Sequence, residues 1–133
     1  KSMNFEQIKI MDSLDFLNTI KSRLSIKKLN LTCYVHSVCS DQPAGHTSII
    51  HSIAQNCVEA IEDRKEDFCC GMGGDRGLMY PDLTKNSIKR SAHFPLKSTI
   101  GVSSSRTCEI ALSNELGIEF ISIEALVYRS LKN

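Results

Sequence analysis

The chain has 133 residues, of which 41% are hydrophobic and 23% are charged, and its formal net charge is +1. These proportions are typical of one globular domain spanning residues 1–133, and they exclude a polyanion binder that works by bulk positive charge. Tryptophan is absent and aromatic residues make up 6%, so we expect no base-stacking platform and no nucleic-acid partner. No apolar run approaches the ~18 residues of a membrane span and no signal peptide is visible, so we expect no membrane span. The sequence leaves the oligomeric state open, and a lysine in first position is typical of a cloning remnant or of a fragment of a longer chain.

Six cysteines occur, at positions 33, 39, 57, 69, 70 and 108. Their spacing indicates no disulfide framework, and the chain is long enough to bury a core without one, so we expect six reduced thiols in a reducing compartment such as the cytoplasm. A zinc site is the competing interpretation. However, no C-x-x-C pair exists, and Cys69, Cys70, His93 and Cys108 could meet only through the tertiary fold, so we predict no metal site.

The first elements are a helix and a strand. Asp12 or Ser13 is expected to cap a helix that carries Leu14, Leu17 and Leu24 at helical spacing and ends near Ser25. Residues 29–39 alternate between two faces and are the best strand in the chain. His36 lies on its partly polar face.

A β-hairpin is the favoured prediction for the next segment. Residues 41–45 have the composition of a turn, residues 46–53 can return as a second strand, and a helix is expected from about residue 55 to residue 64. A rival interpretation stays open, because a helical stripe capped by Thr47 or Ser48 also fits the aliphatic positions. That stripe comprises Ile49, Ile50, Ile53, Ala54, Cys57, Val58 and Ile61.

A charged corner at residues 62–67 and a glycine-rich stretch at residues 68–77 follow. The stretch lacks the Lys-Ser/Thr of a phosphate-binding P-loop, so we interpret it as a mobile surface loop, followed by a turn at residues 80–83. Residues 85–106 then contain five basic side chains and no acidic one. They can bind a phosphorylated cofactor, an inositol phosphate or an acidic partner, or they can form an ordinary solvated face. These side chains are Lys85, Lys89, Arg90, Lys97 and Arg106.

A cysteine at the start of a helix is the feature around which the rest is organised. Residues 93–117 read as a strand, a serine-rich loop and a short helix with Thr107 as N-cap, Cys108 in the first turn and Gly117 as the stop. The free N–H groups of that turn favour a thiolate, although Glu109 opposes it, and a merely packed cysteine is the alternative. A strand at residues 118–121 and a helix capped by Ser122, with Leu126, Val127 and Leu131, complete an α+β fold with a small antiparallel sheet.

Three stretches resemble the papain-like superfamily, in its SUMO-protease-like branch, and within it the YopJ-type effector acetyltransferases. They are the hairpin from His36 to Gly45 and on to Thr47-Ser48-Ile49-Ile50, the pair His93-Phe94 before the nucleophile, and Ser103-Ser104-Ser105 before Cys108. The resemblance implies a cysteine-dependent acyl-transfer enzyme, either a protein acetyltransferase or a protease. It also implies a secreted effector that acts on a protein substrate in a host cytoplasm.

The resemblance also implies roles for individual residues. Cys108 would be the nucleophile, His36 its base and Asn56 the group that orients the histidine. Acetyl-CoA and an inositol phosphate would be the cofactors, bound by Lys89, Arg90, Lys97 and Arg106. His46, His51 and His93 compete with His36, and a non-catalytic protein-interaction domain remains the alternative function.

Overall fold

The computed structural model describes residues 8–41, 45–62, 69–91 and 96–131. Four strands form one sheet in the order β2-β1-β3-β4, and every neighbouring pair is parallel. The strands are β1 (Leu29–His36), β2 (Val58–Glu62), β3 (Ile100–Ser103) and β4 (Glu119–Ser122). The α+β class is therefore confirmed, whereas the predicted antiparallel sheet is wrong.

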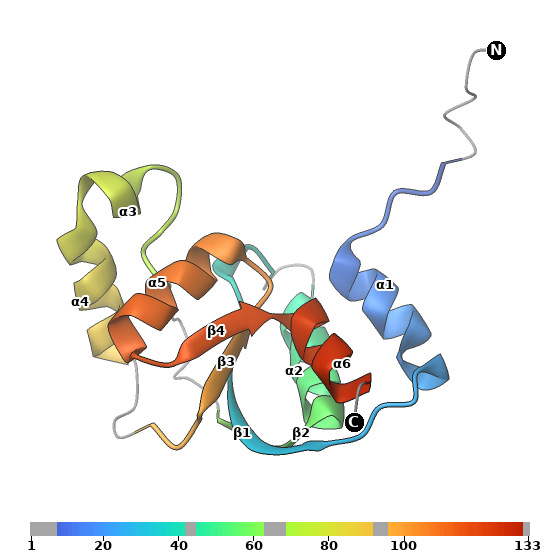
Figure 1. Cartoon of the computed structure of the whole chain (residues 1–133). Coiled ribbons are helices and arrows are strands. Elements are labelled where there is room, and N and C mark those ends of the chain that lie inside the picture. The colour runs from blue at the N-terminus through green and yellow to red at the C-terminus, as the bar shows by residue number, and fades with distance from the viewer. Residues whose placement is uncertain (1–7, 42–44, 63–68, 92–95, 132–133) are drawn as a thin grey trace.

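Helices cover both faces of this sheet (Figure 1). One face packs against α1 (Ser13–Ile20), α2 (His46–Cys57) and α6 (Ile123–Leu131), and the other packs against α4 (Pro81–Ser91) and α5 (Arg106–Leu116). Short helical turns complete the fold, namely η2 (Lys21–Arg23), η3 (Cys39–Asp41) and α3 (Arg76–Met79).

The alternation of side chains along β1 explains why one strand serves two cores. Cys33 and Val35 point into the cluster beneath α1, α2 and α6, whereas Tyr34 between them points into the cluster beneath α4 and α5. A parallel sheet covered on both faces needs apolar residues on both sides of each strand. All three residues are fully buried, with no exposed surface.

A glycine allows close packing in the second core, the hydrophobic cluster beneath α4 and α5. Gly101 on β3 faces the ring of Phe120 on β4, and a Cβ atom at this position would lie 2.5 Å from that ring. Phe120 also meets Tyr34 edge to face, with ring centroids 6.0 Å apart. The two aromatic rings thus fill the space beside Gly101 and leave no room for a side chain there.

Residues 46–57 are helical, so the favoured hairpin is wrong. The rival helical stripe is confirmed as far as Cys57, with Gly45 as N-cap in place of Thr47 or Ser48, whereas Val58 and Ile61 lie in β2. Ile50, Ile53, Ala54 and Cys57 form the buried stripe of α2. The β-branched residues in this segment favour a strand locally, but their spacing fits a helix that crosses over between the parallel strands β1 and β2. The hairpin that contributed to the papain-like resemblance is therefore not formed.

Two further elements were not expected from the sequence. Residues 58–62 form β2 instead of continuing a helix, and residues 81–91 form α4 where a turn and a basic stretch were predicted. Pro81 is the first residue of α4, a position that proline tolerates because its missing N–H has no helical partner there. Most of the predicted charged corner, from residue 63 to residue 67, lies outside the described residues.

Most of the predicted helix caps agree with the structure. Asp12 caps α1 through a hydrogen bond from the Leu14 N–H to its Oδ1, at 2.8 Å. The Ser122 hydroxyl accepts the Ala125 N–H at 3.2 Å at the start of α6. Gly117 ends α5, as expected, but the N-cap of α5 is Ser105 and not Thr107.

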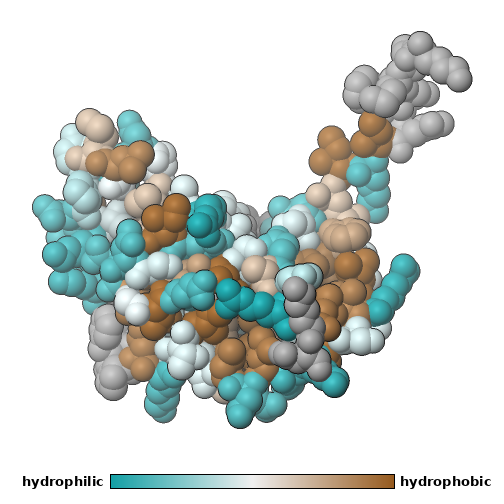
Figure 2. Space-filling model, viewed as in Figure 1, coloured by the Kyte–Doolittle hydropathy of each residue, from teal (hydrophilic) through white to brown (hydrophobic). Residues whose placement is uncertain are grey.

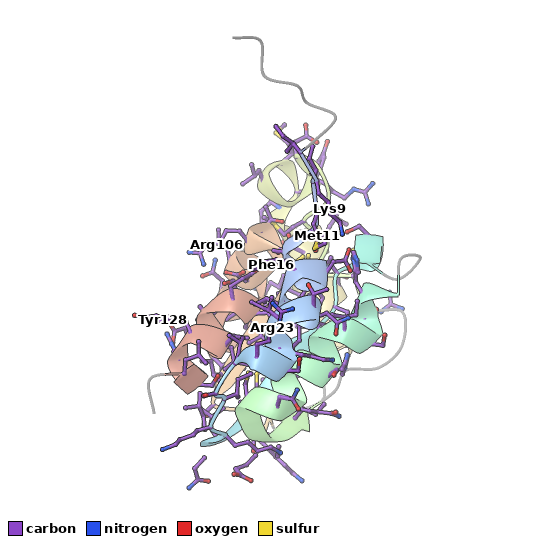
Figure 3. The ribbon with its side chains drawn as sticks, turned by 90° about the vertical axis from the view of Figure 1, so that its right-hand side faces the viewer. Lys9, Met11, Phe16, Arg23, Arg106 and Tyr128 are labelled. Carbon is purple, nitrogen blue, oxygen red and sulfur yellow. The ribbon has the colours of Figure 1, made fainter. Side chains whose placement is uncertain are left out.

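Exposed apolar side chains project from two parts of the molecule. One part is α3 and the beginning of α4, with Leu78, Met79 and Tyr80, and the other includes Ile10 near the N-terminus. Both parts appear as brown projections in the upper half of Figure 2. Figure 3 places Phe16 and Met11 on the side of the molecule that α1 forms. Among the described residues, no helix is both long and apolar enough to cross a membrane.

Candidate functional site

A cluster of thiols and one imidazole lies at the carboxyl ends of the strands. His36 is the last residue of β1, Cys70 follows β2, and Cys108 lies in the first turn of α5 after β3. One ligand atom from each of these three residues lies within 4.8 Å of the other two, and all three residues are buried. From β1 the chain continues to β2 on one side of β1, whereas β3 and β4 lie on its other side. The cluster therefore lies at the topological switch point between β1 and β3, where open parallel sheets bind their ligands.

A short contact between sulfur atoms joins two cysteines of the cluster. The Sγ atoms of Cys70 and Cys108 lie 2.9 Å apart. A hydrogen bond from the Cys108 thiol, together with contributions from His36 and the Met72 backbone N–H, lowers the pKa of Cys70 to about 4 against the cost of burial. The same hydrogen bond, followed by burial, raises the pKa of Cys108. Cys70 is therefore the thiol of this pair that loses its proton more readily.

Two exposed cysteines extend the group. Cys39 lies in η3, directly after β1, and Cys69 precedes Cys70. Partial loss of hydration raises the pKa of Cys39, and the neighbouring thiol of Cys69, to which Cys39 is hydrogen-bonded, raises it further. Cys39 also acts electrostatically on Cys108. We call the set of His36, Cys39, Cys69, Cys70 and Cys108 the cysteine site.

The structure brings together two of the three predicted catalytic residues. His36 and Cys108 belong to the cysteine site. The lowered pKa that the sequence led us to expect at Cys108 is found at Cys70, and the pKa of Cys108 is raised. Asn56 is exposed in the last turn of α2, whereas the carboxyl end of β1 leads into the first turn of that helix. Asn56 therefore lies at the far end of α2 and does not orient His36.

The competing histidines lie elsewhere. The Nε2 atom of His46 is 3.3 Å from Asp15 of α1. The Nδ1 atom of His51 is 2.7 Å from the Thr47 carbonyl within α2. His93 lies outside the described residues.

The basic residues predicted to hold a phosphorylated cofactor are spread over the surface. Lys89 and Arg90 are exposed on α4, and Lys97 lies three residues before β3. Arg106 lies three residues after β3, hence at the other end of this strand; Figure 3 shows it at the outer edge of the molecule. Its guanidinium pairs with the buried carboxylate of Glu109 at 2.7 Å, so that this carboxylate has an ionic partner of its own.

Cys70 is the central residue that sequence reasoning considered only as a zinc ligand and then set aside. It follows no C-x-x-C spacing, and the glycines after it favour an ordinary loop. The positions of the cysteines could have indicated the site, because a cysteine follows each of the strands β1, β2 and β3. This pattern is visible only once residues 58–62 are recognised as a strand.

None of the protein-family models, curated proteins or solved structures matches the chain. The papain-like resemblance remains a hypothesis carried by the residues quoted for it.

Proposed function

We propose that this protein binds a thiolate-ligated metal centre in the cysteine site. The observation that carries the proposal is the convergence of His36, Cys70 and Cys108, whose ligand atoms lie within 4.8 Å of one another. Donors around a tetrahedral ion with bonds of about 2.0–2.3 Å are about 3.3–3.8 Å apart, so small shifts of these side chains would surround one ion.

The chemistry of the donors favours a soft metal. The thiolate is the form of cysteine that binds metals, and Cys70 has a pKa of about 4. An ion would also displace the proton of Cys108, as metals do with thiol ligands. Cys39 can supply a fourth ligand, because it interacts electrostatically with both buried thiols. Cys69, to which Cys39 is hydrogen-bonded, is the alternative fourth ligand. Sets of cysteine and histidine ligands of this kind hold Zn²⁺ or an iron–sulfur cluster.

Reconstitution tests the proposal and distinguishes the two metals. The reduced protein, freed of metal by a chelator, would be titrated without oxygen with Co²⁺ as a probe for Zn²⁺, and separately with ferrous iron and sulfide. We expect a thiolate-to-metal charge-transfer band in one of the two titrations, and its loss in Cys70→Ser. A protein that develops no such band with either metal would not be a thiolate metal protein.

A second candidate function rests on the 2.9 Å separation of the Cys70 and Cys108 sulfur atoms. The thiolate of Cys70 could attack a disulfide of small-molecule or protein origin, and Cys108 could then attack the mixed disulfide. The products would be a Cys70–Cys108 disulfide and two reduced thiols from the oxidant. Mass spectrometry after treatment with oxidised glutathione tests it, because the internal disulfide removes two hydrogens from the protein and adds no glutathione.

Acyl transfer by Cys108 and His36, with acetyl-CoA and an inositol phosphate as cofactors, remains a hypothesis from the resemblance. It requires Cys108 to ionise in the presence of the Cys70 thiolate, which raises the pKa of Cys108. The metal centre makes use of both thiols and of His36 as well, and is therefore the function we favour.

A further inference from the structure

Helix α4 holds the backbone on both sides of Cys70. The Thr84 hydroxyl donates to the Gly71 carbonyl oxygen at 3.3 Å, and the Ser87 hydroxyl donates to the Cys69 carbonyl oxygen. Thr84 and Ser87 are three residues apart and so lie on one face of the helix. Their two acceptors are the carbonyl groups of the residues immediately before and after Cys70.

The loop lies against α4 without free space. Gly71 has a φ of 77°, and a Cβ atom there would lie 2.9 Å from the Thr84 Cα. Gly77 is buried at the start of α3, and a Cβ atom there would meet Met72 and would lie 3.1 Å from the Thr84 hydroxyl. Close approach of the α4 backbone and the positive φ explain the glycine at position 71, whereas the Met72 side chain occupies the space beside Gly77. Thr84 itself is buried, so its hydroxyl is held in place by its surroundings.

Helix α4 also packs beside Cys108. Ile88 of α4 is fully buried in the hydrophobic cluster that contains Cys70 and Cys108. Helix α4 also packs against α5, which carries Cys108 in its first turn. A shift of α4 would therefore move the Cys70 loop relative to Cys108.

We propose that Thr84 and Ser87 are positioning residues, which hold the Cys70 thiol opposite Cys108 and His36 and couple the α3–α4 segment to metal binding. This inference rests on the metal centre proposed above. Groups that orient metal ligands contribute about 10–100-fold to metal affinity. Because coupling between two equilibria is reciprocal, metal binding in turn stabilises the α3–α4 segment, which stands away from the sheet in Figure 1.

Metal affinity of matched variants tests the inference. Competition with a chromophoric chelator would be measured for Thr84→Val, Thr84→Ser and Ser87→Ala, with Thr19→Val as the control. The Thr19 hydroxyl bonds the Asp15 and Phe16 carbonyls on α1 and lies outside the cysteine site. We expect Thr84→Val to lose about 10–100-fold in affinity, Thr84→Ser to retain most of it, and Thr19→Val to be unchanged.

Ser87→Ala keeps the inference falsifiable if Thr84→Val fails to fold, and it should also weaken metal binding. Wild-type affinity in both Thr84→Val and Ser87→Ala would overturn the inference. So would an equal loss in Thr84→Val and Thr19→Val, because that result would indicate a general effect on folding.

Hydrogen exchange separates this inference from the proposed function. Metal should slow exchange of the backbone amides of α3 and α4 in the wild type and much less in Thr84→Val. If the wild type binds no metal, the proposed function fails. The positioning role is then tested by the exchange of the amides of residues 70–72 in the metal-free protein. Faster exchange in Thr84→Val than in Thr84→Ser would uphold the positioning role, and equal exchange would overturn it.

Discussion

Cys70 and Cys108 are 38 residues apart in the sequence, yet their sulfur atoms lie 2.9 Å apart in the folded chain. The parallel sheet produces this contact, because the chain returns to the same edge after each strand. The two thiols are equally inaccessible, with 4% and 6% of their residues' surfaces exposed. Their difference in protonation therefore comes from their partners and not from their exposure.

Alkylation reveals which thiol carries the charge. At about pH 6.5, limiting iodoacetamide should modify Cys70 faster than Cys108 in the metal-free, reduced protein, because only the thiolate is nucleophilic. Peptide mapping by mass spectrometry measures the two rates. Faster modification of Cys108 would restore the Cys108 nucleophile that the papain-like resemblance implies.

The pH dependence of stability follows from the same thiolate. The pKa of Cys70 is about 4 in the folded protein, against an ordinary value of 9.0. Between pH 4 and pH 9 the Cys70 thiol is protonated in the unfolded chain and ionised in the folded protein. The free energy of unfolding therefore rises with pH in this range, and the contribution of Cys70 to stability is lost as the pH falls toward 4. We expect Cys70→Ser to have a smaller rise than the wild type in urea unfolding of metal-free protein.

Cys57→Ser is the control for that measurement. Burial raises the pKa of Cys57 above 9.0, so this thiol stays protonated across the whole window. If the free energy of unfolding rose equally with pH in the wild type and in Cys70→Ser, Cys70 would not be a thiolate in the folded protein.

Glu62 connects β2 to the segment that leads into β3. Its carboxylate accepts the Lys97 N–H at 3.1 Å, the Ser98 N–H at 2.9 Å and the Ser98 hydroxyl at 2.6 Å. We expect Glu62→Ala to lower the free energy of unfolding by about 1–3 kcal/mol, because the Ser98 donors lose a charged partner. Glu59→Ala, on the exposed part of the same strand, should change it by less than about 0.5 kcal/mol in the same denaturant series. Equal effects of the two substitutions would contradict the role of Glu62.

Packing of the second core depends on Gly101. Gly101→Ala should lower the free energy of unfolding by about 1–3 kcal/mol, because the added methyl group meets the Phe120 ring. Gly73→Ala is a suitable control, since nothing lies within 4 Å of its added Cβ atom. Combining Gly101→Ala with Phe120→Leu should cost less than the sum of the two single substitutions, as expected for residues in contact. A simple sum in thermal unfolding would show that the ring does not cause the effect.

Local patterns in the sequence predicted part of this structure. The strand that begins at Leu29, although it ends three residues earlier than predicted, the helix that begins just before Cys108 and the cap at Ser122 all follow from residues close to one another in the chain. The topology could not be predicted in this way, because residues 46–57 combine strand-forming residue types with helical spacing. Only the crossover between β1 and β2 decides between a strand and a helix there. Cys70 was set aside as a ligand for a related reason, since its partners follow other strands and its neighbouring glycines indicate only a loop.

The most direct test of the central claim is the metal content of the protein at equilibrium. After reconstitution with the metal that gives a charge-transfer band, and removal of excess metal, the wild type should retain one centre per chain. Cys70→Ser and Cys108→Ser should retain little, His36→Ala should bind more weakly, and Cys57→Ala, a buried thiol in the other core, should bind like the wild type. Retention of a full centre by Cys70→Ser or Cys108→Ser, or equal loss in Cys57→Ala, would contradict the claim that the cysteine site holds a metal.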